Sequence, residues 1–114
     1  MSFFDSEMVR AEMTEIAELQ EEVYGSVFKF PSMSKEDKIK HVEIMERLLN
    51  KQKVIYTRMS LSDDPEAVEM KNRIMHSAVM MGMAPGTDMN IILNNMSKML
   101  EIMKEQIDKT GFDL

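Results

Sequence analysis

The chain has 114 residues and carries 14 Lys and Arg against 20 Asp and Glu, a formal net charge of −6. This length predicts a single helical domain over residues 1–114 and excludes a two-domain enzyme. The sequence contains no cysteine, which excludes disulfides and thiolate metal sites. The acidic balance argues against attraction to nucleic acid or anionic lipid through bulk charge.

The sequence also lacks the marks of a membrane or exported protein. No stretch approaches the ~20 apolar residues of a membrane-spanning helix. The N-terminus lacks the basic region and apolar block of a signal peptide. We therefore expect a cytoplasmic protein without membrane contact.

Apolar residues recur at every third or fourth position between the glycines and prolines, which is the helical period. This spacing predicts an all-α bundle of four helices joined by short loops, at about residues 5–24, 35–60, 65–81 and 88–109. The first helix is expected to be capped by Asp5 and to end at Gly25. The apolar residues Val27 to Phe30 are then expected to form a loop.

The later helix starts carry clear capping signals. Ser34 and Asp37 have the spacing of a capping box, and Asp64 precedes a proline at the first helical position. The main buried stripe expected on the second helix is made of Val42, Met45, Leu49 and Tyr56. The last helix has apolar residues spaced four, three, four, three and four apart, as in a coiled coil, namely Met89, Leu93, Met96, Leu100, Met103 and Ile107.

The most informative feature is the placement of charge. Residues 1–31 contain seven acids and two bases, whereas residues 32–60 contain seven bases and four acids, so the net charge changes from −5 to +3. On the second helix, a sector of ~40° holds four bases, assuming ~100° per residue. These four, Lys40, Arg47, Lys51 and Arg58, are called the basic line below. They are expected on the solvent side of the helix, where they form either a plain solvated face or a docking strip for an acidic partner.

A second group of apolar residues lies away from the expected stripes. The third helix presents Val68, Met75 and Val79, about 120° around the helix from Ile74, and the fourth presents Ile91 and Ile102. Either the third helix is central and buried on two sides, or these five residues form the interface of a homodimer or another protein partner.

No pattern of residues indicates catalysis or a bound cofactor. Methionine occurs 15 times, but many of these positions fall on expected core stripes, so adaptable packing explains them better than copper binding. His41 and His76 stand alone on different helices, form no ligand pair and are expected to be solvated. We expect no enzyme activity, no catalytic residues, no metal and no cofactor.

Several segments carry a resemblance to a known family. They are Phe3 to Val9, Tyr56 to Ala67 and the following Met80-Met81-Gly82. The chain resembles a small family of uncharacterised proteins found in cyanobacteria and their phages. The resemblance implies a bacterial or infected-cell setting and supplies no functional residues.

Taken together, these features favour a non-enzymatic, dimeric interaction or adaptor protein, and the resemblance favours one encoded by a phage to engage a host complex. The first alternative is a nucleic-acid- or transcription-associated factor that uses the basic line. The acidic first helix and the lack of a helix-turn-helix pattern weigh against this alternative. The second alternative is a structural component of a virion or another assembly.

Overall fold

The computed structural model describes residues 3–80, 82–84, 86 and 88–110. These residues form an all-α bundle of four helices: α1 (Glu7–Ser26), α2 (Lys35–Leu61), α3 (Pro65–Met80) and α4 (Met89–Thr110). Two 3-10 helices, η1 (Phe3–Asp5) and η2 (Val27–Ser32), precede and follow α1. The predicted fold class and helix ranges are confirmed, and residue 81, the predicted end of the third helix, lies outside the described residues.

The local signals explain most of the helix boundaries. The Ser34 hydroxyl accepts a hydrogen bond from the Asp37 N–H at 3.2 Å, and Asp64 Oδ1 accepts one from the Glu66 N–H at 2.9 Å. These are the predicted caps of α2 and α3. After α3, Gly82 has a φ of 102°, a left-handed conformation that suits glycine and ends the helix.

The start and end of α1 differ from the sequence prediction. Ser6 caps the helix in place of Asp5, because Phe3–Asp5 turns as a 3-10 helix before it. At the other end, Val27–Ser32 forms a 3-10 helix where a loop was expected. This turn buries Phe30 and leaves Phe28 fully exposed.

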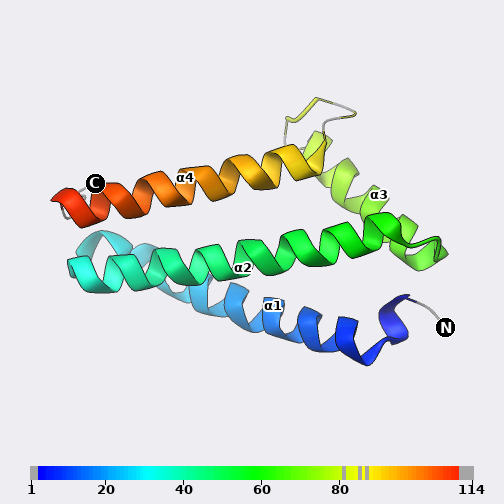
Figure 1. The fold of residues 1–114 in the computed structure, drawn as a ribbon, viewed down its shortest axis with the longest axis horizontal. Coiled ribbons are helices and arrows are strands. Elements are labelled where there is room, and N and C mark those ends of the chain that lie inside the picture. The colour runs from blue at the N-terminus through cyan, green and yellow to red at the C-terminus, as the bar shows by residue number, and fades with distance from the viewer. Residues whose placement is uncertain (1–2, 81, 85, 87, 111–114) are drawn as a thin grey trace.

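Three long helices lie side by side with α2 in the middle (Figure 1). α1 and α4 both run antiparallel to α2, and the shorter α3 is inclined to them at one end. The molecule measures 48 × 33 × 20 Å, so it is flat. This arrangement gives α2 two broad sides, one of which faces α3.

The core therefore surrounds α2. One cluster joins α1 to α2 through Ile16, Leu19, Leu48 and Ile55 with their neighbours, and another joins α2 to α4 through Val42 and Ile107. Beyond the predicted main stripe on α2, Leu48, Ile55 and Met59 are also buried. Of the two alternatives for the third helix, a central position is wrong, since α2 occupies that place.

Candidate interaction surface

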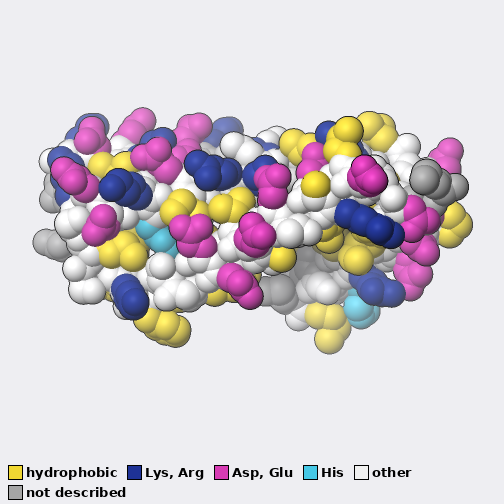
Figure 2. Space-filling model, turned by 90° about the horizontal axis from the view of Figure 1, so that it is seen from below, with side chains coloured by type: hydrophobic (Ala, Val, Ile, Leu, Met, Phe, Trp, Pro, Cys, Tyr) yellow, Lys and Arg dark blue, Asp and Glu magenta, His cyan; other side chains and the backbone are white. Residues whose placement is uncertain are grey.

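The side of α2 that faces away from α3 carries charged residues and is called the outer face here. At ~100° per residue, Arg47 and Val54 project nearly opposite Gln52 and Tyr56. A hollow of about 570 Å³ lies along this face, between α1 and α4. It is lined by Glu12, Glu43, Glu46, Arg47, Asn50, Lys51, Val54 and Lys104. Seen from the α1 side, acidic and basic side chains are interspersed on the surface, with hydrophobic side chains exposed between them (Figure 2).

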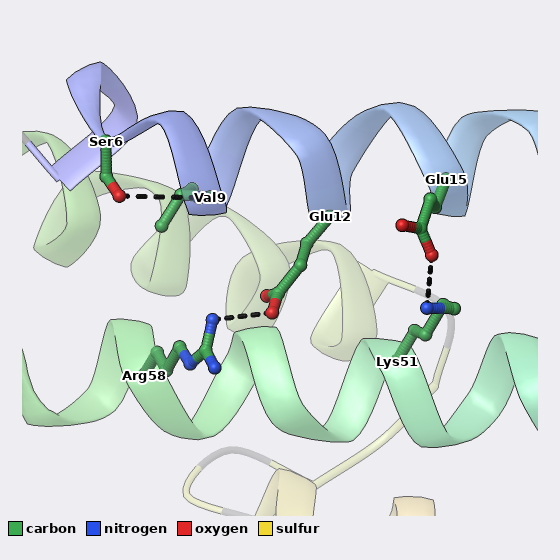
Figure 3. A network of polar contacts seen from close by, with 6 residues as sticks. All are labelled: Ser6, Val9, Glu12, Glu15, Lys51 and Arg58. Carbon is green, nitrogen blue, oxygen red and sulfur yellow. Dashed lines mark hydrogen bonds and ion pairs between the residues drawn. The ribbon is translucent and has the colours of Figure 1, made fainter.

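Ion pairs cross between the helices beside this hollow. Arg58 Nη1 lies 2.6 Å from Glu12 Oε1, and the Lys51 ammonium pairs with the Glu15 carboxylate (Figure 3). On the other side, Lys104 Nζ donates to Glu46 Oε1 at 2.9 Å, and this hydrogen bond raises the pKa of Lys104. These pairs fix the antiparallel register of α1 and α4 against α2.

The basic line is therefore divided. Lys51 and Arg58 lie only partly on the solvent side, because they are half-buried against α1, although Lys51 also lines the hollow of the outer face. The reason is that Glu12 and Glu15 of α1 point toward α2 (Figure 3). Lys40 and Arg47 are exposed, and the structure describes no ion pair for either.

The opposite side of the layer forms a long apolar groove above α2. One half of this groove has a volume of about 320 Å³ and is partly covered by α3 through Met70 and Ile74. The other half, about 240 Å³, has no lining residue from α3 and is called the open half. It is lined by Val23, Met45, Leu48, Leu49, Gln52, Met96, Met99 and Leu100. Gln52 lines both halves and marks their junction.

None of the five predicted interface residues is among the residues that line either half of this groove. Val68 on α3 is 42% exposed, and Met75 and Val79 are half-buried on the same helix. Ile91 and Ile102 of α4 are exposed. Met99, which belongs to none of the predicted stripes, is 68% exposed at the edge of the open half. Met99 lies outside the coiled-coil-like series of apolar residues on α4, so that series did not predict its position.

A buried polar group lies where α2 begins. His41 packs against the Phe30 ring with centroids 5.4 Å apart, and Lys38 Nζ lies 5.9 Å from the centre of the same ring. Desolvation lowers the pKa of His41, and the charge of Glu22 partly opposes this shift. The sequence had suggested a solvated histidine, whereas His41 is buried and His76 is exposed.

The described residues offer neither a metal site nor a membrane span. No group of three His, Asp or Glu side chains among them is arranged to hold a metal ion. Within the same residues, no helix is both long and apolar enough to cross a bilayer. The features that stand out are thus two surfaces of opposite character on one layer of helices.

Comparison with known proteins gives a family without an assigned activity. No curated protein and no solved structure matches the chain. A family model described as a domain of unknown function (DUF1825) matches residues 1–107. The resemblance to an uncharacterised family is confirmed to this extent. Because the match covers almost the whole sequence, the chain belongs to the family described as domain of unknown function DUF1825.

Proposed function

We propose that the protein is a non-enzymatic interaction protein that binds another polypeptide in the open half of its apolar groove. The observation that carries this proposal is the lining of that half, which is apolar except for Gln52. Soluble proteins rarely leave a continuous apolar groove exposed unless a partner covers it. A groove between two helices, with a third helix as its floor, can also bind another helix.

The chemistry of the groove defines the partner that fits. A helix with apolar side chains at positions i, i+3 or i+4, and i+7 would fill the space between α1 and α4. The flexible thioethers of Met45, Met96 and Met99 can adapt to the shape of such a helix. The occupant is therefore an amphipathic helix supplied by another chain.

The outer face supplies a second, weaker contact surface in this proposal. Lys40 and Arg47 remain available to an acidic partner, whereas Lys51 and Arg58 are engaged with α1. With half of the basic line occupied, the nucleic-acid alternative loses support. A virion component would use the same groove to build open-ended assemblies, and its oligomers would have no fixed size.

The cellular setting is also part of the proposal and is supported only by the resemblance. We place the protein in the cytoplasm of cyanobacteria or of cells infected by their phages, where it would engage a host complex. The proposal that the groove binds a polypeptide does not rest on this cellular setting.

Site-specific photo-crosslinking in cells tests the interaction. A benzophenone amino acid replaces Met99 at the edge of the groove or, as the matched control, Val54 on the outer face, which is 45% exposed. We expect Met99 to yield one discrete crosslinked polypeptide that disappears when Met96→Glu is added. The Val54 control should not yield that product. Equal crosslinking from both positions would contradict a specific groove.

A further inference from the structure

The open half of the groove exists because α3 is too short to cover the whole face. α3 has 16 residues, which at 1.5 Å per residue is ~24 Å. The molecule is 48 Å long. α3 lies inclined at one end of the molecule (Figure 1), and its residues line one half of the groove but not the other.

α3 also carries apolar side chains that are only partly buried within its own chain. Val68, Met75 and Val79, the α3 strip, lie about 120° around the helix from Ile74, which faces the groove. Together with the exposed Asn72, they follow the spacing of a helix-packing seam, four, three and four residues apart. A seam of this kind fits against a second set of helices.

α3 and the open half of the groove lie on the same face of the chain, at opposite ends. A two-fold axis that is perpendicular to α2, parallel to the layer of helices and close to Gln52 exchanges these ends and turns the two groove faces toward each other. Such an axis brings the α3 of each chain over the open half of the other, so both contacts form at once and the assembly closes. A surface that matches itself in this way is the requirement for an isologous dimer.

We propose that a second copy of the chain covers the open half of the groove, with each α3 strip packed against the open half of the other copy. This inference rests on the proposed function and names the occupant. Neither half of the groove has a charged lining residue. Two copies with a net charge of −6 each therefore meet at a groove without charged lining residues, and their charged outer faces point away from each other.

Light scattering on the purified chain over a range of concentrations tests the proposal. The wild type is expected at twice the chain mass of 13.2 kDa. Val68→Lys and Met99→Glu each place two charges in the interface, one per contact, and are expected to halve the mass. The matched control is Val54→Lys, because Val54 and Val68 are 45% and 42% exposed on opposite sides of the layer. This control is expected to remain a dimer.

Mixing the two variants gives the sharper result. In the mixed dimer, one contact joins the lysine strip to the glutamate groove, and the other contact is unaltered. We therefore expect an equal mixture of Val68→Lys and Met99→Glu to recover the dimer mass, although each variant alone is monomeric. Circular dichroism of each variant verifies that the helices are intact, which separates loss of the interface from loss of the fold.

The outcomes distinguish this inference from the proposed function. A wild type that stays monomeric at high micromolar concentration overturns the second-copy proposal. If Met99 then crosslinks to a different polypeptide in cells, the proposed function stands without it. If Met99 crosslinks to nothing, both proposals fail. A mixture that remains monomeric while the wild type is a dimer overturns the placement of the α3 strip on the open half.

Discussion

The two faces of the α1–α2–α4 layer are built from the same three helices but contribute differently to the structure. On the outer face, the helices are joined by ion pairs such as Arg58 with Glu12. On the apolar side and between the helices, burial of side chains such as Leu49 and Ile107 provides the contacts. Burial supplies most of the free energy of folding, whereas charge pairs chiefly select which helices meet and in which register.

The largest effect is expected from a change in the buried contacts. Ile107 is fully buried between α2 and α4. Ile107→Ala leaves a cavity there, and we expect the free energy of unfolding to fall by about 2–5 kcal/mol in urea titrations. Val54→Ala on the outer face should change it by about 0.5 kcal/mol or less. Similar losses in the two variants would contradict the division of roles between the faces.

A smaller effect is expected from the ion pair between α1 and α2. Glu12 Oε2 is buried and has no hydrogen-bond partner among the described residues. Arg58→Met therefore leaves a poorly solvated carboxylate without its counter-charge, and we expect a loss of about 1–2 kcal/mol.

The exposed pair of Arg73 with Glu69 within α3 is the matched control. Arg73→Met should cost about 0.2–0.5 kcal/mol. A double-mutant cycle of Arg58 and Glu12 isolates the pairwise energy. If its coupling energy does not exceed that of the cycle on Arg73 and Glu69, the pair between α1 and α2 contributes no more to stability than an exposed pair.

The buried histidine predicts a dependence of stability on pH. Desolvation lowers the pKa of His41 below its ordinary 6.5, so the unfolded chain binds the proton more readily than the folded chain. The contribution of neutral His41 to stability is complete above pH 6.5 and is lost as the pH falls below this value toward the folded pKa.

We expect His41→Gln to reduce the loss of stability between pH 7.5 and 5.5, measured by thermal unfolding in matched buffers. His76→Gln, at the exposed histidine, is the control and should follow the wild type. Parallel pH profiles for wild type and His41→Gln would show that His41 does not contribute.

The smallest effect is expected within the basic line itself. Lys51 pairs with Glu15, whereas Arg47 is exposed without a described ion pair. Lys51→Ala should therefore lower the free energy of unfolding by up to about 1 kcal/mol, and Arg47→Ala by almost nothing. Added salt should reduce this difference. Equal values for the two alanine variants at low salt would place both residues in the same solvated environment.

The helices were predictable because their signals are local. Ser34 and Asp64 act on N–H groups within a few residues, so their roles are visible in the sequence. The position of α2 between its neighbours depends on contacts distant in the chain. A helical wheel with one main buried stripe places Arg58 in solvent. Because α2 has neighbours on two sides, a residue away from that stripe can still contact one of them, as Arg58 contacts α1. The open half of the groove was equally hidden, because it depends on where α3 ends in space.

The methionines around the groove also give this surface a chemistry of its own. Met99 is 68% exposed at the edge of the open half, whereas Met59 is buried. A peroxide would convert exposed thioethers to sulfoxides first, placing a polar oxygen on an apolar surface without altering the helices beneath it. Because methionine sulfoxide is reduced enzymatically, this change is reversible. The oxidation state of a few side chains thus sets how apolar the open half of the groove is.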